Sequence, residues 1–435
     1  VAYELGRRRW RRVGAYLSVA AVLPYVVGVL VFRIGLVNAY TDLLPISWRV
    51  AGWPTRERMI AAVYVVYLFA LAGTLLAALG HALFTRWRNR QGSDKSRPGR
   101  LVRVVRRPVI QWSFGTLVLF AAGAGSAVCS LDGEQKAMLA VHHYSCRQDW
   151  PRVLEAARRC PGQYHVLVAV NRALYHTGRL NRDLFLYAQQ PEGLLRTGDD
   201  HVMLYWHVFD TLIDLGLANL AEKNLTECLE TFGEHPLILE RLAKVNLIKG
   251  KTTAARVYLG ALSKTLFHSR WASDCLARLD ADPNSCGDPD LATLRAQRLR
   301  ADSISTFYAE DALLTALIEQ NGGNRMAFEY LTTWYMLTGQ LPKIAQQIER
   351  LDRFGYAEIP PLCQEALLIY AYGTGKPVDL HGRSIPPETE QRFKQFSRVV
   401  NQYGRDRSAA IAELAREYRG SYFFYYFCTV VAKRQ

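Results

Sequence analysis

Leu174-Tyr-His-Thr-Gly178 ends an apolar helical stretch with a glycine, and the same pattern recurs at Leu212-Ile-Asp-Leu-Gly216, Asn246-Leu-Ile-Lys-Gly250 and Tyr335-Met-Leu-Thr-Gly339. The first two intervals between these glycines are 38 and 34 residues. A period of about 34 residues is typical of the tetratricopeptide repeat (TPR), in which two helices are joined by a tight turn. The pattern therefore predicts TPR-like helical hairpins, with a non-repetitive helical domain as the alternative.

Two further features agree with hairpins. In the TPR a small residue falls five positions after the turn glycine, where the second helix packs closely on the first. Ala221 and Ala255 match this position, whereas Asp183 and Ile344 do not. An earlier unit fits at residues 144–158, where Asp149-Trp-Pro151 places proline in the first turn of a helix. Because apolar residues recur at spacings of three and four from residue 134 onward, we expect an all-α fold with a TPR-like α-solenoid over residues 132–372.

A solenoid of stacked hairpins has a concave surface that is suited to binding. We registered the first helix of each unit on its glycine to find the inward positions. The residues predicted to bind a partner there are His165, Arg172, Tyr175, His176, Trp206, Asp210, Asp214, Glu240, Lys244 and Glu329. Their mixture of both charges with aromatic rings suits a peptide or protein segment better than an anionic polymer.

Three long apolar runs precede this region, at residues 13–37, 57–84 and 108–131. Each reaches the roughly 20 residues that a helix needs to cross a bilayer. They predict a three-helix transmembrane anchor over residues 1–131. Gly115, Gly123 and Gly125 in the third run would let another helix approach closely.

The charge of the chain is concentrated in this anchor. Residues 1–131 contain 18 Lys and Arg but 4 Asp and Glu, so they carry +14 of the total +15 and leave +1 for the rest. This distribution argues against nucleic-acid binding, which needs positive charge on a folded surface. Basic residues cluster before the first run and between the second and third. The positive-inside rule then places the N-terminus in the cytoplasm and residues 132–435 in the periplasm of a bacterial inner membrane.

The end of the chain is predicted to form a separate element. Residues 373–387 are rich in glycine and proline and are typical of a linker, and residues 388–435 are predicted to form capping helices. Seven of the ten residues from Tyr418 to Phe427 are aromatic. This aromatic cluster either closes the end of the solenoid or contacts a partner or the membrane interface.

The sequence contains no constellation that predicts catalysis, a cofactor or a metal. In Gly250-Lys-Thr-Thr253 the resemblance to a phosphate-binding loop fails, because Val245 stands where that loop has its first glycine. Cys146 with Cys160, and Cys275 with Cys286, are possible disulfides in an oxidising compartment. Free buried thiols are the alternative for all four.

The chain resembles a bacterial family of unknown function, number 6057. The resemblance lies in Asn171-Arg-Ala-Leu-Tyr-His-Thr-Gly-Arg-Leu180, Met326-Ala-Phe-Glu-Tyr-Leu331, Gly355-Tyr-Ala-Glu-Ile-Pro-Pro-Leu-Cys-Gln-Glu-Ala366 and Gly420-Ser-Tyr-Phe-Phe-Tyr-Tyr-Phe427. It covers roughly residues 134–427, with looser similarity through the apolar runs. The family implies membrane spans joined to helical repeats and implies no activity, so it transfers no catalytic residue.

These observations predict a membrane-anchored scaffold and not an enzyme. We expect an accessory or stabilising subunit of a larger membrane complex, whose partners are the lipid bilayer and other membrane proteins. No small-molecule substrate is indicated. The alternative is a component of envelope assembly or transport, either an enzyme or a receptor, that acts on a lipid-linked or periplasmic substrate.

Overall fold

The structure is a computed structural model that describes residues 10–31, 36–41, 117, 120–121, 123–125, 133–195, 207–282, 289–299, 310–404 and 406–432. The chain divides into two compact units, residues 1–133 and 134–435. All regular secondary structure within the described residues is helical, which confirms the all-α class.

The first unit contains a helix that is long and apolar enough to cross a membrane. This helix consists of α2 (Trp10–Pro24) and its continuation η1 (Tyr25–Val31), and its mean hydropathy is 2.0. A short helix, α3 (Leu36–Thr41), packs against η1, where Gly28 leaves room for Ala39. A helix of this kind suits a membrane anchor, and a signal sequence near an N-terminus has the same properties.

The structure locates one such helix among the residues that it describes. The predicted second span, residues 57–84, and most of the third, residues 108–131, lie outside them. Of the predicted first span, residues 13–37, the described helix covers residues 13–31, and residues 32–35 lie outside the described part of the chain. Gly115 also lies outside the described residues. A Cβ added at Gly123 or Gly125 would meet no described atom within 4 Å, so no packing partner is seen for either glycine.

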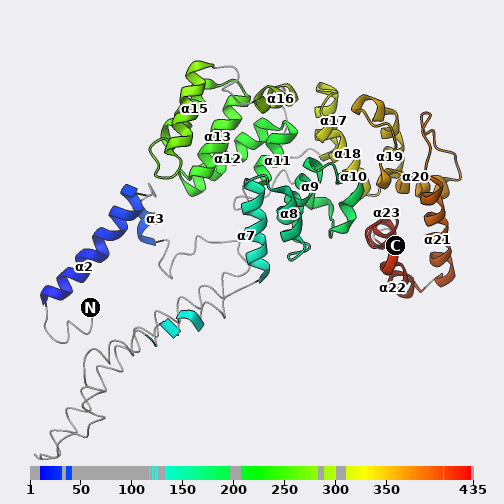
Figure 1. Ribbon diagram of the computed structural model, residues 1–435, viewed down its shortest axis with the longest axis horizontal. Helices are drawn as coiled ribbons and strands as arrows, with labels where there is room; N and C mark the ends of the chain where they lie inside the picture. The colour runs from blue at the N-terminus through cyan, green and yellow to red at the C-terminus, as the bar shows by residue number, and fades with distance from the viewer. Residues whose placement is uncertain are drawn as a thin grey trace, which may run out of the picture. The chain divides into compact units, whose positions relative to one another are not determined.

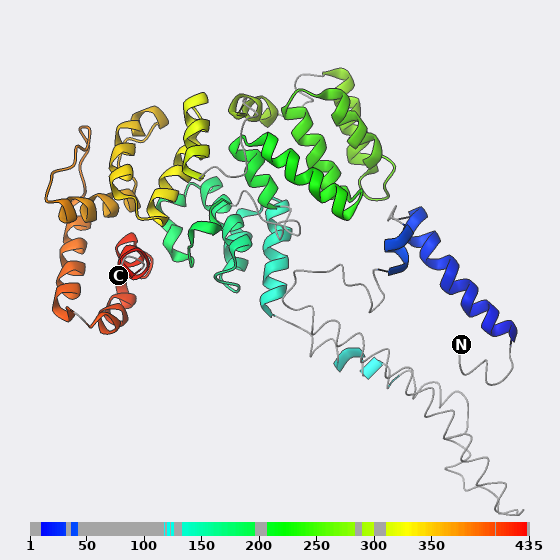
Figure 2. The same cartoon turned by 180° about the vertical axis from the view of Figure 1, so that it is seen from behind.

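The second unit is a succession of helices in which neighbours along the chain pack together (Figures 1 and 2). Its helices are α7 (Gly133–Cys146), α8 (Trp150–Ala157), α9 (Tyr164–His176), α10 (Leu180–Asp183), η2 (Leu184–Leu186), η3 (Pro191–Gly193), α11 (His207–Leu215), α12 (Ala218–Phe232), α13 (Pro236–Ile248), α14 (Thr252–Leu262), α15 (Ser269–Ala281), α16 (Pro289–Gln297), α17 (Glu310–Gln320), α18 (Arg325–Leu337), α19 (Leu341–Gln347), η5 (Ile348–Phe354), α20 (Pro361–Thr374), α21 (Pro387–Tyr403), α22 (Arg407–Tyr418), α23 (Tyr422–Tyr425) and η6 (Tyr426–Val430).

Each predicted turn glycine ends one helix and precedes the next. Gly178, Gly216, Gly250 and Gly339 have φ angles of 67°, 93°, 73° and 69°, in the left-handed region that favours glycine. The first helices α9, α13 and α18 each begin 14 residues before their glycine. Other local predictions also hold: α8 begins at Trp150 with Pro151 in its first turn, and Ala221 and Ala255 are fully buried.

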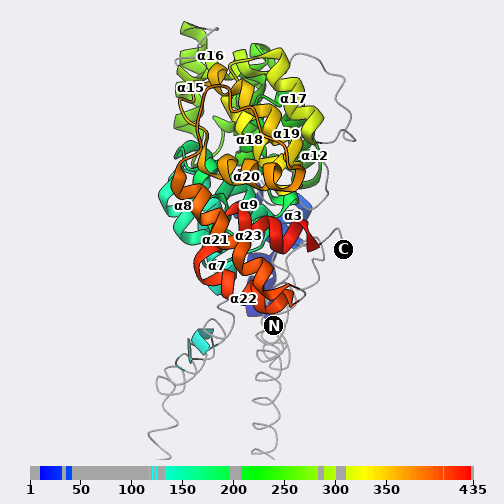
Figure 3. The ribbon, with the colours of Figure 1, turned by 90° about the vertical axis from the view of Figure 1, so that its right-hand side faces the viewer.

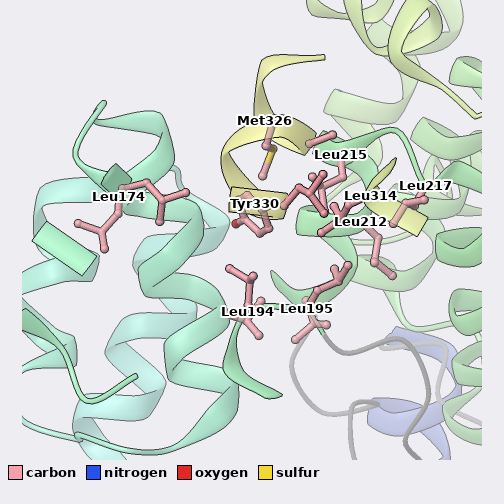
Figure 4. Packing of buried hydrophobic residues seen from close by; sticks show 14 of the residues in the cluster. Leu174, Leu194, Leu195, Leu212, Leu215, Leu217, Leu314, Met326 and Tyr330 are labelled. Carbon is pink, nitrogen blue, oxygen red and sulfur yellow. The ribbon is translucent and has the colours of Figure 1, made fainter. Parts of the chain in front are cut away.

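Leucine-rich faces of several helices form one core. Figure 4 shows this packing between α9, the segment after η3, α11, α17 and α18. The side chains that it labels are Leu174, Leu194, Leu195, Leu212, Leu215, Leu217, Leu314, Met326 and Tyr330. The burial of this apolar surface is the main force that holds the helices together.

The aromatic cluster at the end of the chain lies largely on α23, which packs against α20 and α22 of the second unit (Figure 3). Tyr422 and Phe423 are almost completely buried, and the hydroxyls of Tyr422 and Tyr425 donate to the carbonyl oxygens of Met336 and Leu337 at 3.1 and 3.0 Å. These carbonyls belong to the last turn of α18, which lacks partners within its own helix. The arrangement favours the capping interpretation over a contact with a partner. The segment between α20 and α21 forms no regular helix.

We expect Gly216→Ala to destabilise the protein more than Gly250→Ala. At Gly250 an added Cβ meets nothing within 4 Å, so alanine costs only the left-handed backbone, about 1 kcal/mol. At Gly216 the Cβ would lie 2.3 Å from the carbonyl oxygen of Gln297, which raises the cost to about 3 kcal/mol. Thermal unfolding of the two full-length variants in detergent measures the difference. Equal losses would contradict the close approach at Gly216.

Candidate functional site

α9 and α11 are each the first helix of a predicted hairpin, and residues at equivalent positions of the two helices lie opposite each other. Arg172 and Asp210 both stand six residues before their turn glycine, and Arg172 Nη1 lies 3.7 Å from Asp210 Oδ2. His176 and Asp214 both stand two residues before it, and His176 Nε2 lies 3.1 Å from Asp214 Oδ2. Two adjacent pairs in the same register show that α9 and α11 lie side by side and run in the same direction.

Additional ion pairs extend these contacts into one group, which we call the ion cluster: Arg172, His176, Asp210, Asp214 and Arg241. Arg172 Nε donates to Asp214 Oδ2 at 2.7 Å. Arg241 of α13 donates through Nε and Nη2 to the two carboxylate oxygens of Asp210, each at 2.8 Å. This bidentate geometry is the strongest form of an arginine–carboxylate pair. The ion cluster therefore connects three helices.

Because the two guanidinium groups of the ion cluster are buried, their charges need the carboxylates as partners. Arg172 and Arg241 are 3% and 7% exposed, so neither guanidinium can be solvated by water instead. Burial alone would raise the pKa of Asp214, but Arg172 and the hydrogen bond with His176 outweigh it and lower that pKa to about 2. The pKa of Asp210 is also lowered, because Arg241 and Arg172 outweigh its burial. Both carboxylates are therefore ionised at neutral pH.

An aromatic ring covers one end of the ion cluster. The rings of Trp150 and His176 stack with centroids 4.6 Å apart, and the guanidinium of Arg172 lies 4.9 Å from the Trp150 ring centroid. Trp150 is the first residue of α8, so this contact adds the preceding hairpin to the group. The cation–π contact is favourable because Arg172 is desolvated.

Cys146 lies at the other end and is not bridged. Its Sγ lies 3.6 Å from Arg241 Nη2 and 3.9 Å from His142 Nε2. Cys146 and Cys160 are both free, which corrects the predicted disulfide between them. The Cys160 thiol is buried and donates to the carbonyl of Ala156 at 3.8 Å. The two thiols therefore contact different partners and not each other.

The second predicted bridge involves Cys286, which lies outside the described residues. Cys275 itself is buried. Arg278 Nη2 lies 3.0 Å from Cys275 Sγ. Burial raises the pKa of the Cys275 thiol, which keeps it protonated at neutral pH.

The predicted partner-binding residues differ in their burial. Arg172, His165 and Glu329 are buried, so the prediction that they face a partner is corrected. His165 Nε2 lies 3.2 Å from Met138 Sδ, and burial lowers the pKa of this histidine to about 4. Trp206 lies outside the described residues.

Glu329 belongs to a second polar group. Its Oε1 accepts hydrogen bonds from the Tyr356 hydroxyl at 2.5 Å and from Arg325 Nε at 2.9 Å. Arg325 also lies 4.7 Å from the centroid of the Tyr356 ring, and Asn181 Nδ2 donates to the Tyr356 hydroxyl at 3.4 Å. Tyr175 packs edge-on against Tyr330, 6.5 Å between centroids, and is half-buried. These contacts connect α9, α10 and α18.

Sequence reasoning missed Arg241 and Tyr330. Both stand nine residues before a turn glycine, directly after the predicted Glu240 and Glu329 and three residues before the position of Arg172 and Lys244 in the register. Three residues correspond to nearly one helical turn, so the position lies on the same side of the helix. If this position had been included in the inner-face register, both residues would have been found from the sequence. Of the predicted residues, His176 is exposed, and the partly buried ones are Tyr175, Asp210, Asp214, Glu240 and Lys244.

A third buried polar group binds the aromatic end of the chain. Glu365 of α20 is 5% exposed, and its Oε2 accepts a hydrogen bond from the backbone N–H of Tyr422 at 2.6 Å. Arg392 Nη1 lies 3.5 Å from Glu365 Oε1. Burial raises the pKa of Glu365 to about 7, against the opposing effect of the Tyr422 hydrogen bond and of Arg392. Glu365 therefore titrates near neutral pH.

The comparisons with known proteins identify a family and nothing more specific. The model of a family of unknown function, DUF6057, matches residues 1–429. The chain belongs to this family. The match includes the apolar N-terminal region as well as the helical unit, so it extends beyond the 134–427 range expected from sequence. No curated protein and no solved structure matched the chain. Among the residues that the structure describes, no group of His, Cys, Asp and Glu could hold a metal ion.

Loss of one member of the ion cluster should be far more costly than loss of an exposed pair. We expect Arg172→Met to destabilise the DUF6057 protein by about 3 to 5 kcal/mol, because Asp214 is left buried and poorly paired. Lys223→Met is the control, since its pair with Glu227 at 3.8 Å is solvent-exposed and worth less than about 1 kcal/mol. Arg172→Met/Asp214→Asn should recover part of the loss. Chemical denaturation measures all three, and a double variant no better than Arg172→Met would contradict direct pairing.

The Glu365 pKa predicts that stability falls as pH rises. A folded-state pKa raised from 4.5 to about 7 contributes stability below the lower value, and that stability is lost as pH rises through about 7. The loss amounts to about 3 kcal/mol. Glu365→Gln should be less sensitive to pH over this range, whereas Glu413→Gln on the exposed face of α22 should behave as wild type. Melting temperatures from pH 5 to about 8 test this, and parallel curves for Glu365→Gln and wild type would refute it.

Proposed function

We propose that the DUF6057 chain is a membrane-anchored, TPR-like scaffold. It acts as an accessory or stabilising subunit of a larger membrane complex, with its repeat region on the periplasmic side. The matched register of α9 and α11 carries the proposal. In a TPR-like array successive first helices lie side by side in the same direction, which brings equivalent positions opposite each other. The pairs Arg172–Asp210 and His176–Asp214 have this relation.

The ion cluster supports a scaffold because it makes the first helices rigid relative to one another. A binding surface built on fixed helices loses little conformational entropy when a partner binds. Each buried charge of the cluster is paired with another side chain of the cluster. Such paired charges hold helices in place more readily than they perform chemistry.

The surface beside the ion cluster is suited to a peptide or protein segment. Trp150 and His176 supply a stacked aromatic pair that is partly accessible. On α13, Glu240 and Lys244 are half-buried and lie one turn apart beside Arg241. An aromatic anchor next to one charge of each sign is typical of protein interfaces.

The membrane anchor combines the apolar helix Trp10–Val31 with the two further apolar runs of the sequence. Basic residues before the first run and between the other two support a cytoplasmic N-terminus and a three-span, multi-pass topology in the bacterial inner membrane. An odd number of spans places the helical unit in the periplasm.

We expect the chain to co-purify with stoichiometric membrane-protein partners. Mass spectrometry of the chain purified from native membranes in mild detergent would identify them. The double charge reversal Glu240→Lys/Lys244→Glu, which keeps the net charge, should reduce partner recovery at least about tenfold with a much smaller effect on the melting temperature, because in this proposal the two side chains contact the partner. Lys223→Glu on α12 is the control. Recovery as a monomer under all conditions would overturn the scaffold proposal.

A further inference from the structure

The turn between α14 and α15 exposes large apolar side chains. Leu266, Phe267 and Trp271 are 60%, 77% and 40% exposed, and they lie within six residues of sequence. α15 contacts α14 and lies at an edge of the second unit (Figure 1). Scattered apolar residues on a surface need no explanation, but neighbouring ones on a protruding turn indicate a contact site.

The sequence through this turn carries charge of one sign, and the next acidic residue is Asp274, which is exposed on α15. From Arg241 to Ser273 the chain contains seven Lys and Arg and no Asp or Glu, although residues 132–435 together carry only +1. Four of the seven are paired with acidic residues of other segments: Arg241, Lys249, Lys251 and Arg256. Lys264 and Arg270 are exposed on either side of Leu266 and Phe267.

Polar groups at the start of the turn are hydrogen-bonded to the end of α14. The hydroxyls of Ser263 and Thr265 donate to the carbonyl oxygens of Gly260 and Leu262 at 2.9 and 2.7 Å. The backbone N–H of Lys264 donates to the carbonyl of Ala261 at 3.2 Å. These bonds cap the end of α14, so less of its backbone needs water. The turn can therefore enter a poorly hydrated environment at reduced cost.

We propose that residues 263–271, the α14–α15 turn, insert into the headgroup region of an anionic bilayer. Phe267 and Leu266 enter the acyl boundary, Trp271 lies at the interface, and Lys264 and Arg270 contact lipid phosphates. Tryptophan prefers this interface, and basic side chains are attracted by anionic lipids. A lipid surface fits better than an acidic protein because exposed apolar and aromatic side chains are combined here with basic ones, which is the composition of segments that lie in the membrane interface. The proposal rests on the membrane anchoring proposed above.

Site-specific photocrosslinking tests this contact. The photoreactive amino acid p-benzoylphenylalanine replaces Phe267 in the full chain, which is reconstituted into nanodiscs of phosphatidylcholine and phosphatidylglycerol. Intact-mass spectrometry then measures phospholipid adducts. The matched control places the same probe at Tyr372, which is 68% exposed on α20. We expect several-fold more adduct at position 267 than at position 372. Equal yields at the two positions would overturn the proposal.

Charge and anchoring are tested separately. Lys264→Gln/Arg270→Gln should lower the adduct at position 267 in anionic nanodiscs and have little effect in phosphatidylcholine alone, and an unchanged anionic yield would refute the role of these charges.

A probe at Leu23, in the apolar helix, reports on anchoring. Adduct at position 23 without adduct at position 267 would overturn the bilayer contact and leave the anchor intact. Absence of adduct at both would overturn the anchor as well. In native membranes, a protein adduct in place of lipid at position 267 would overturn the proposal in favour of a protein partner.

Discussion

Two carboxylates on α11, Asp210 and Asp214, are paired with arginines from the helices on either side, and the packing of the first helices depends on this pairing. Removing an ionised carboxylate from water costs several kcal/mol unless a partner compensates for it. Arg172 comes from α9 and Arg241 from α13. A slip of α11 along either neighbour would separate a pair, whereas leucine contacts would tolerate a small shift. The charges therefore define the register, and the apolar core provides most of the stability.

The turn glycines make this register possible, and they could be recognised in the sequence. A left-handed φ angle is needed where one helix ends and the next begins, and glycine adopts it without steric cost. Gly178 and Gly216 thereby place Arg172 and Asp210 at equivalent points of their helices. Local rules of this kind predicted the helix ends, the buried Ala221 and Ala255, and the all-α class. They act within one hairpin, where sequence neighbours are also neighbours in space.

Contacts between distant segments were not predictable in the same way. Tyr422 and Tyr425 cap the last turn of α18, 86 and 88 residues earlier in the chain. The helical period indicates which side chains share a face, but it does not say which helix that face meets. For the same reason the inner-face register identified Arg172 and Asp214 but assigned them to a partner, when each is the partner of the other. The Cys146–Cys160 bridge failed similarly, because spacing does not reveal the direction of the two thiols.

Charge pairing also explains how a nearly neutral domain can have a basic edge. The ion cluster consumes two arginines and two carboxylates within the core, and Glu222 neutralises Lys249. When these paired charges are left out of the net charge of the region, Lys264 and Arg270 remain beside the exposed Phe267. The sequence has no acidic residue between Glu240 and Asp274. The total charge of the region conceals this asymmetry. In the membrane-anchored arrangement proposed above, the tether would hold the domain near the bilayer at high effective concentration, which would allow even a small patch of this kind to orient it.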